Sequence, residues 1–121
     1  MQQIVAGVDS VEIARMERLI SRESFCNRIF SVEEQQYIVG KHHPAQTAAG
    51  HFAAKEAFLK AMGTGITRLD LCEVGVSHDV AGAPRLALRG WASELAEGWS
   101  LSLSITHTNA TATAFVVAYH E

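Results

Sequence analysis

Residues 51–65 constrain the fold more than any other stretch, because they predict a largely apolar helix that carries one charged side chain among apolar neighbours. The pattern predicts the last turns of a helix over about residues 44–62, followed by a glycine-flanked turn at 63–65. Pro44 suits the first turn of that helix. Its apolar face carries Ala54, Ala57, Phe58 and Ala61 at helical spacing. We therefore expect this helix to lie in the core.

Glu56 is the charged side chain in question. It lies between Phe52, four residues earlier, and Leu59, three residues later. A carboxylate among apolar neighbours is costly unless it is paired or bound to a metal ion. The simpler alternative is a helical pair with Lys60 at i,i+4, worth only about 0.2–0.5 kcal/mol. The residues alone leave both interpretations open.

A second acid, Asp9, ends the apolar run Ile4-Val5-Ala6-Gly7-Val8, which predicts a buried strand over about residues 3–9. The end of such a strand is a common place for a ligand in sheets flanked by helices. The local alternative is equally simple, since Asp9-Ser10-Val11-Glu12 also fits a helix N-cap with an acid three residues on. Asp9 is therefore either a ligand or a cap.

The remaining pattern predicts an α+β fold in a single domain, residues 1–121, with helices early and strands late. A helix is expected after the first strand, to about residue 21, and Ser31-Val32-Glu33-Glu34 is a capping box opening a short helix that stops near Gly40. Alternation predicts strands over about 72–76, 86–88, 101–107 and 112–119, with a short helix over 91–97.

Composition limits the class of partner. A net charge of −3 argues against a general nucleic-acid binder, and no apolar run is long enough to span a membrane, so we expect a cytoplasmic protein. Positive charge is nevertheless concentrated early. Arg15, Arg18 and Arg22 recur at helical spacing and would stripe one side of a helix. That stripe is either an ordinary solvated face or a docking surface for an acidic protein.

Three stretches together carry a resemblance to a known family. They are Gly7-Val8-Asp9-Ser10-Val11-Glu12, then Phe52-Ala53-Ala54-Lys55-Glu56-Ala57-Phe58-Leu59-Lys60 with Gly63-Thr64-Gly65, and Leu103-Ser104-Ile105-Thr106-His107-Thr108. In this order and spacing the chain resembles the phosphopantetheinyl transferases of the holo-acyl-carrier-protein synthase type. The resemblance implies that family's fold, with N-terminal helices packed on a mainly antiparallel sheet, and a homotrimer with sites between protomers.

The same resemblance implies an activity. The family moves the 4′-phosphopantetheine arm of coenzyme A to a serine of an acidic apo acyl carrier protein, using Mg2+ and releasing adenosine 3′,5′-bisphosphate. Asp9 and Glu56 correspond to the metal ligands, which fits Mg2+ because it needs only one or two protein carboxylates. Lys60 corresponds to the lysine near the diphosphate. Glu56 or a metal-bound water would take the serine proton.

Other residues match the family's coenzyme contacts. The resemblance implies such contacts for Lys55, Lys60, Gly63, Thr64, Gly65, Pro84, His107, Thr108 and His51. Several have simpler explanations: a C-cap explains one glycine of the turn, Gly82-Ala83-Pro84 reads equally as a hairpin turn, and His107 ends an apolar strand face. His51 stands where the family usually has arginine, so the grip on the 3′-phosphate would be weaker or supplied by Lys41, His42 or His43.

Arg15, Phe25 and Arg28 correspond to the family's segment that docks the carrier protein. The alternative to an enzyme is a non-catalytic module of the same fold that binds coenzyme A or a carrier protein. Keeping Asp9, Glu56 and Lys60 argues against that alternative, because a binding module needs no metal pair.

Overall fold

The structure is a computed structural model that describes residues 2–64 and 70–121. In chain order the elements are β1 (Gln3–Glu12), α1 (Ile13–Leu19), α2 (Glu23–Ile29), α3 (Val32–Val39), α4 (Pro44–Ala61), the 3-10 helix η1 (Leu71–Glu73), β2 (Val74–His78), β3 (Pro84–Leu88), α5 (Gly90–Leu95), β4 (Ser100–His107) and β5 (Thr111–His120). The expected α+β class is confirmed.

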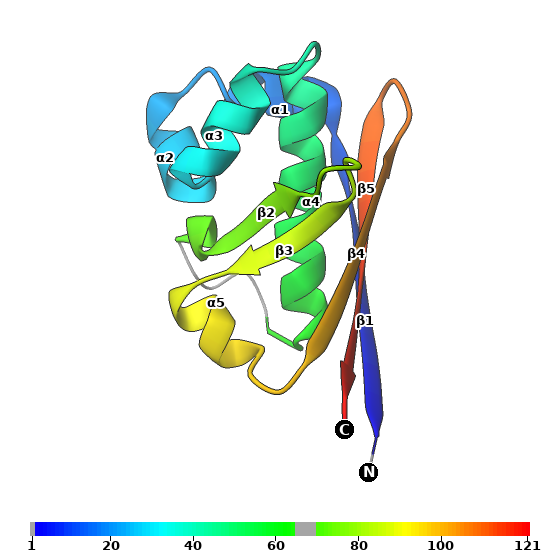
Figure 1. Cartoon of the computed structure of the whole chain (residues 1–121). Helices are drawn as coiled ribbons and strands as arrows, with labels where there is room; N and C mark the ends of the chain where they lie inside the picture. Colours follow the sequence, from blue (N-terminus) through cyan, green and yellow to red (C-terminus); the bar gives the residue numbers. More distant parts are fainter. Residues whose placement is uncertain (1, 65–69) are drawn as a thin grey trace.

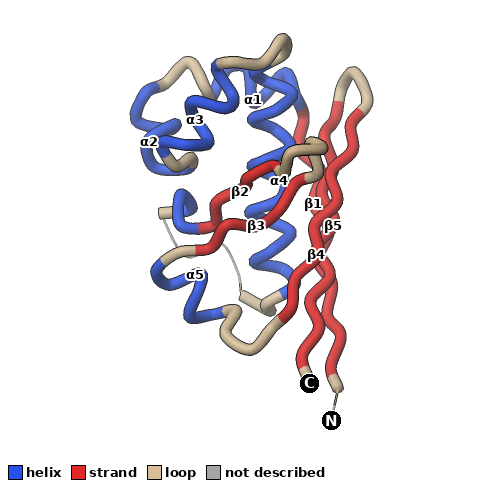
Figure 2. The backbone as a smooth tube through the Cα atoms, in the orientation of Figure 1, coloured by secondary structure: helices blue, strands red, loops and turns tan. Residues whose placement is uncertain are grey.

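The long helix α4 lies between two sheets (Figures 1 and 2). On one side is an antiparallel three-stranded sheet in the order β1-β5-β4, and on the other side the antiparallel hairpin β2-β3 crosses the helix. The helices α1, α2 and α3 gather at one end of α4, and α5 lies near the other end (Figure 1). The helix α4 therefore packs against both sheets, as its apolar sequence predicts.

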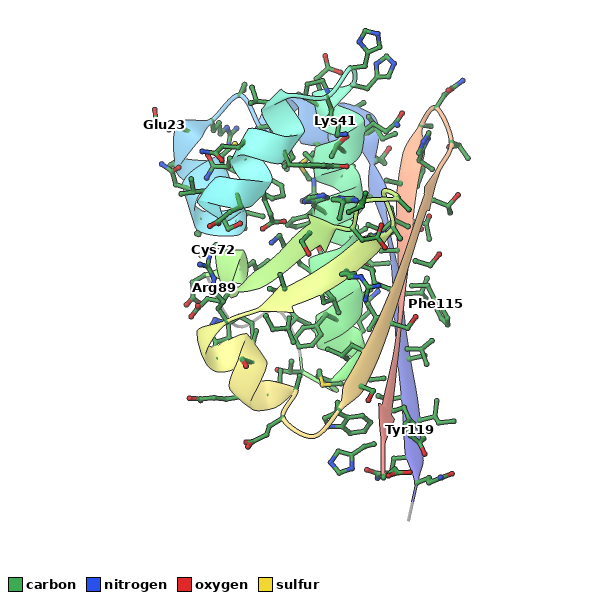
Figure 3. The ribbon with its side chains drawn as sticks, in the orientation of Figure 1. Glu23, Lys41, Cys72, Arg89, Phe115 and Tyr119 are labelled. Carbon is green, nitrogen blue, oxygen red and sulfur yellow. The ribbon has the colours of Figure 1, made fainter. Side chains whose placement is uncertain are left out.

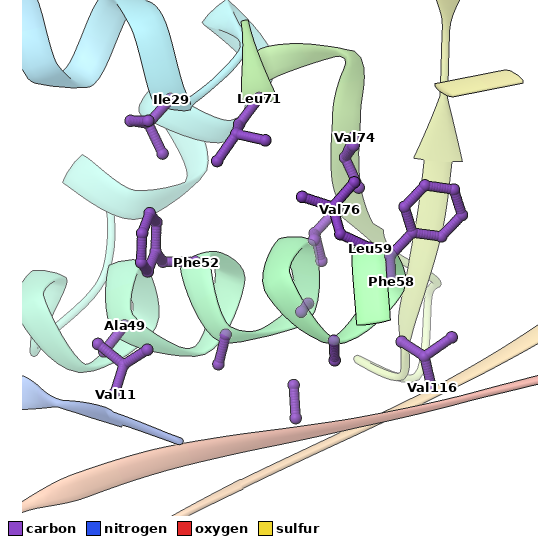
Figure 4. Close-up of a cluster of buried hydrophobic side chains, with 14 of the residues drawn as sticks. Val11, Ile29, Ala49, Phe52, Phe58, Leu59, Leu71, Val74, Val76 and Val116 are labelled. Atoms are coloured by element: carbon purple, nitrogen blue, oxygen red, sulfur yellow. The ribbon is translucent and has the colours of Figure 1, made fainter. Parts of the chain in front are cut away.

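Alternation along β5 explains how α4 meets the three-stranded sheet. Ala112, Ala114, Val116 and Ala118 are buried on the inner face, and the helix presents alanines to them. Small side chains on both surfaces let backbone approach backbone. On the far side of α4, Phe58 and Leu59 pack with Val74 and Val76 of β2 (Figure 4). The core is therefore divided by α4 into two connected halves.

Two early boundaries differ from the sequence prediction. The first strand runs on to Glu12, so Asp9 lies inside β1, and the N-cap alternative for Asp9 is wrong. The helix expected to reach about residue 21 ends at Leu19, and Arg22 is instead the N-cap of α2. The three arginines therefore do not share one helix. Pairing of β1 with β5 over its whole length extends the strand.

The later elements agree more closely. The Ser31–Glu34 capping box is confirmed, with both reciprocal hydrogen bonds at 3.1 Å. Cys72 and Glu73, expected in a strand, lie instead in the 3-10 turn before β2. Over the described residues, no helix has the length and apolar character needed to cross a membrane.

Candidate active site

Gly7 brings the strand β1 and the helix α4 unusually close together. A Cβ atom at this position would lie 2.6 Å from the backbone nitrogen of Ala61 and closer still to the carbonyl oxygen of Ala57. Only glycine can therefore occupy this point of the strand without moving the helix. Side chains two residues apart share a strand face, so Asp9 also faces α4. The close approach sets Asp9 beside the last turns of the helix.

Lys60 is the helical side chain that Asp9 meets. Its ammonium nitrogen Nζ lies 3.1 Å from Asp9 Oδ1 and 3.0 Å from the carbonyl oxygen of Val8. The Lys60 side chain is 55% exposed, and that of Asp9 is 14% exposed. Among the described residues the ion pair of Lys60 is thus with Asp9, and the alternative of a helical pair with Glu56 is not the one that forms. The ammonium keeps a donor for a ligand.

Glu56 completes the cluster. Its carboxyl group is half-buried, and that burial, followed by the negative charge of Asp9, raises its pKa above the ordinary glutamate value. Lys60 and Arg15 act in the opposite direction with smaller effect. Lys60, one helical turn after Glu56, is ion-paired with Asp9, so the fold brings these two acids, which lie far apart in the sequence, to the same end of α4.

The donor set suits Mg2+. Hard cations prefer carboxylate oxygens, and Mg2+ uses one or two protein carboxylates with the rest of its octahedron filled by phosphates and water. A bound cation would also offset the negative charge of Asp9, which after burial is the second cause of the raised pKa of Glu56. No group of three or more His, Cys, Asp or Glu residues positioned for a metal ion occurs in the part of the chain that the structure describes. A site of Asp9 and Glu56 would thus leave positions for substrate.

The predicted docking residues lie in three different settings. Arg15, on α1, is exposed and acts on the Glu56 pKa, so it borders the acidic pair. Arg28 is exposed on α2. Phe25 is half-buried, with its ring centroid 6.1 Å from that of Phe30 and 6.2 Å from that of Phe52. Phe25 therefore supports the helix α2 more than it offers a free ring to a partner.

Lys55 does not fit its expected role as a coenzyme contact. Its side chain is fully buried, and Nζ donates to Glu34 Oε1 at 2.7 Å, to the Val74 carbonyl at 2.7 Å and to the Leu71 carbonyl at 3.1 Å. An ammonium group has three N–H donors, and all three are used inside the protein. The expectation for Lys55 is corrected to a structural role, joining α3, α4 and β2.

Glu34 holds His51 as well as Lys55. His51 is 1% exposed, and its Nδ1 lies 2.9 Å from Glu34 Oε2, while its Nε2 lies 3.0 Å from Nε2 of His78. Burial alone would raise the pKa of Glu34, but the hydrogen bonds and charges of His51 and Lys55 together hold it below the ordinary value. His51 is thus held firmly, although it still borders the cavity described next.

Three predicted coenzyme contacts line one pocket of about 270 Å³: His51, Pro84 and His107. Lys41 lines it too, which agrees with one of the expected sources of positive charge. His107 Nε2 lies 3.0 Å from the Gln46 side-chain nitrogen. Thr108, by contrast, is used in the turn before β5, where its hydroxyl accepts hydrogen bonds from the backbone N–H groups of Ala110 and Thr111.

The turn after α4 is a helix C-cap. Gly63 has a φ of +73°, its N–H donates to the Lys60 carbonyl at 3.1 Å, and the Thr64 N–H donates to the Leu59 carbonyl at 2.9 Å. This is a Schellman arrangement. The amides of Gly63 and Thr64 are therefore committed to the helix, which corrects the expected phosphate contact through them. Gly65 lies outside the described residues.

Sequence reasoning missed three residues around His51 and its pocket, namely Glu34, Tyr37 and His78. Tyr37 lines the pocket and stacks on His78, with ring centroids 4.2 Å apart. Glu34 was visible as a capping-box residue, but the box explains only one of its oxygens. Nothing in the spacing of His78 predicts a contact with His51, because that contact depends on how the β2-β3 hairpin crosses α4.

Comparison with known proteins shows the family of this chain. Residues 6–118 match the model of the 4′-phosphopantetheinyl transferase superfamily. The chain is 39% identical to a holo-(acyl-carrier-protein) synthase of Treponema denticola over 92% of this chain and 94% of that protein, and 42% identical to one of Geobacter metallireducens over 92% and 93%. An ACPS-CoA complex of Chronobacterium ammoniagenes superposes with a TM-score of 0.85 at 27% identity, covering 98% of each chain.

Proposed function

Because this chain belongs to the 4′-phosphopantetheinyl transferase superfamily, we propose that it transfers the 4′-phosphopantetheine arm of coenzyme A to a serine of an apo acyl carrier protein. The transfer would require Mg2+ and release adenosine 3′,5′-bisphosphate. Residues 1–121 would act as one phosphopantetheinyl transferase domain in the cytoplasm, within fatty-acid synthesis.

We call Asp9, Glu56 and Lys60 the open cluster, because Lys60 is largely exposed to solvent. This cluster is the observation that carries the proposal. Its members come from β1 and α4, and the close approach at Gly7 sets them side by side. A module that only binds coenzyme A has no use for two converging carboxylates, one with a raised pKa. The cluster therefore favours an enzyme over the non-catalytic alternative.

The residues present have definable tasks in such a transfer. The serine oxygen attacks the diphosphate phosphorus that carries the pantetheine arm, and the bond from that phosphorus to the bridging oxygen breaks. Mg2+ held by Asp9 and Glu56 would supply positive charge to the phosphoryl oxygens. Glu56 or a water bound to the metal would take the serine proton. Lys60 would neutralise charge on the leaving 5′-phosphate of adenosine 3′,5′-bisphosphate.

Coenzyme A would contact both this cluster and the pocket lined by His51, Pro84 and His107, in sites that lie between the protomers of a homotrimer. Lys41 supplies a further positive charge at the pocket.

The carrier protein would dock on α1 and α2, through Arg15 and Arg28. Both guanidinium groups belong to exposed residues, and Arg15 adjoins the reacting carboxylate. Reversing charge with Arg15→Glu should raise the Michaelis constant for carrier protein roughly tenfold, because complementary charge guides such docking, while the affinity for coenzyme A stays unchanged. Steady-state kinetics and calorimetry separate the two; equal loss of both would remove Arg15 from docking.

The outer face of the three-stranded sheet supports a homotrimer. Ile4, Val8 and Phe115 are 72%, 51% and 46% exposed, and the Phe115 side chain projects away from the helices (Figure 3). Apolar residues gathered on one sheet face mark an interface more often than a free surface. Phe115→Glu should convert the trimer to monomer in analytical ultracentrifugation, whereas Val80→Glu, on the exposed hairpin loop, should leave it intact.

Mass spectrometry of an apo acyl carrier protein tests the activity. Incubation with this protein, coenzyme A and Mg2+ should add one phosphopantetheine group, and EDTA should abolish the gain. No gain with several carriers, despite confirmed coenzyme A binding, would favour the binding module.

A further inference from the structure

We propose that Gln46 is a positioning residue for His107: its side-chain amide donates to the imidazole and fixes which ring nitrogen carries the hydrogen. Gln46 lies in the first turn of α4, and His107 is the last residue of β4. Both side chains line the pocket of about 270 Å³. The inference rests on the proposed function only where it names coenzyme A as the ligand, because the state of the ring is a property of the free chain.

Thr108 holds one edge of the His107 ring. Nδ1 of His107 lies 3.3 Å from the carbonyl oxygen of Thr108. A carbonyl oxygen only accepts, so Nδ1 carries a hydrogen and donates it. Thr108 is itself held by the turn before β5, since its N–H donates to the Thr111 carbonyl at 2.8 Å and its hydroxyl accepts from the N–H groups of Ala110 and Thr111. The acceptor for the Nδ1 hydrogen is thus fixed in place.

Gln46 holds the opposite edge of the ring. Its amide nitrogen lies 3.0 Å from Nε2 of His107. A neutral imidazole with its hydrogen on Nδ1 has a lone pair on Nε2, and the NH2 group of Gln46 is the donor that meets this lone pair. The two hydrogen bonds agree with each other, because each requires the same tautomer. Together they select the Nδ1–H form.

Hydrogen bonds rather than packing must hold this ring. His107 is exposed, whereas Gln46 is half-buried. An exposed side chain turns freely among its rotamers unless specific contacts restrain it. Gln46 is the better anchored of the two, because its backbone N–H donates to the His43 carbonyl at 3.1 Å and it belongs to an 18-residue helix. The long helix therefore positions the exposed imidazole through Gln46.

The same amide has groups left for a ligand. Only one of its two N–H donors is used by His107, and its second N–H and its oxygen have no other partner among the described residues. A molecule in the pocket therefore finds a donor, an acceptor and the Nε2 edge of the ring in one fixed arrangement. Preorganisation of this kind reduces the ordering that binding requires.

Nuclear magnetic resonance of the histidine ring nitrogens tests the inference without ligand or catalysis. Above the ordinary range of histidine titration, His107 of the intact protein should carry its hydrogen on Nδ1. Its signals are identified by their loss in His107→Gln. Gln46→Lys keeps a donor and should keep this tautomer, whereas Gln46→Glu has only acceptors and should place a hydrogen on Nε2.

Gln36→Glu, exposed on α3, is the matched control for the added charge and should leave the His107 signals unchanged. A hydrogen on Nε2 of the neutral ring in the unaltered protein would overturn the inference. The same tautomer in Gln46→Lys and Gln46→Glu would overturn it too, because Gln46 would then not be the residue that selects it.

Gln46→Leu tests what this positioning does for binding. Affinity for coenzyme A in calorimetry should fall roughly three- to tenfold, as expected for the net loss of one hydrogen bond, while turnover at saturating coenzyme A stays within about twofold. Gln36→Leu should change neither quantity. Unchanged affinity in a folded Gln46→Leu protein would overturn the positioning role. The expected tautomers in a protein that modifies no carrier would support the inference while rejecting the proposed activity.

Discussion

Two pairs of a carboxylate and a lysine lie along α4, and they differ chiefly in access to solvent. Lys55 and Glu34 have side chains 0% and 1% exposed, whereas those of Lys60 and Asp9 are 55% and 14% exposed. The closed pair uses every lysine donor internally, while the open pair leaves a donor and a neighbouring acid free for a ligand. Similar side chains five residues apart on one helix thus stabilise the core in one place and, under the proposed function, would take part in the chemistry in the other.

Glu56→Gln should have the largest effect on the open cluster. Removing the proposed metal ligand, which is also one of the two candidate bases, should lower turnover by about 10²–10⁴-fold. Stability should be unchanged or slightly higher, because burial and Asp9 already disfavour the ionised carboxyl. Carrier modification and thermal unfolding measure the two effects, with exposed Glu94→Gln on α5 as the control. Turnover equal to that of the control would contradict the assignment.

In the closed pair of Lys55 and Glu34, Lys55→Met should have the opposite effect, because it should lower stability and not coenzyme A affinity. It leaves the buried Glu34 carboxylate with one fewer partner, so the free energy of unfolding should fall by about 3–5 kcal/mol. Urea unfolding gives this value, and coenzyme A affinity of the folded fraction should be unchanged. A variant as stable as the parent would show that Lys55 is not the internal link between α3 and β2.

Lys60→Met removes the positive charge of the exposed lysine beside Asp9. Loss of a donor at the leaving phosphate should lower turnover by about 10²–10³-fold, whereas a solvent-exposed ion pair contributes less than about 1 kcal/mol to stability. Carrier modification measures the effect on turnover, and thermal unfolding measures the effect on stability. A simple helical or surface pair would produce the small stability loss with full activity.

Acid should distinguish the two glutamates, because their pKa values shift in opposite directions. The lowered pKa of Glu34 adds stability above the ordinary glutamate value of about 4.3, and this is lost as pH falls through the folded value. Glu56, with a raised pKa, stabilises the fold at low pH and loses that effect as pH rises. Glu34→Gln should therefore reduce, and Glu56→Gln increase, the gain in unfolding free energy between acid and neutral pH.

The open cluster could be predicted from the sequence because its members belong to compact local patterns. Asp9 ends the apolar part of a strand, and Glu56 stands among apolar residues of a helix. Their meeting could only be inferred through the family resemblance, because it depends on Gly7 lying under α4. The glycine was visible in the motif, but the backbone contact that it allows was not.

The buried contacts of Lys55 could not be predicted from the sequence, because they depend on how separate elements pack together. Lys55 adjoins Glu56 in sequence, yet a rotation of one residue around a helix turns it to another layer. Its partners lie on α3, in η1 and in β2, and their convergence depends on the packing of the hairpin. The break between α1 and α2 was missed similarly, because residues 20–22 contain neither glycine nor proline.

Binding of Mn2+, as a stand-in for Mg2+, tests the central claim most directly: Asp9 and Glu56 form one cation site in the folded chain. Electron paramagnetic resonance should report one saturable Mn2+ per chain in the presence of coenzyme A, and both Asp9→Asn and Glu56→Gln should weaken it sharply while the fold persists. Unchanged Mn2+ affinity in both folded variants would contradict the account.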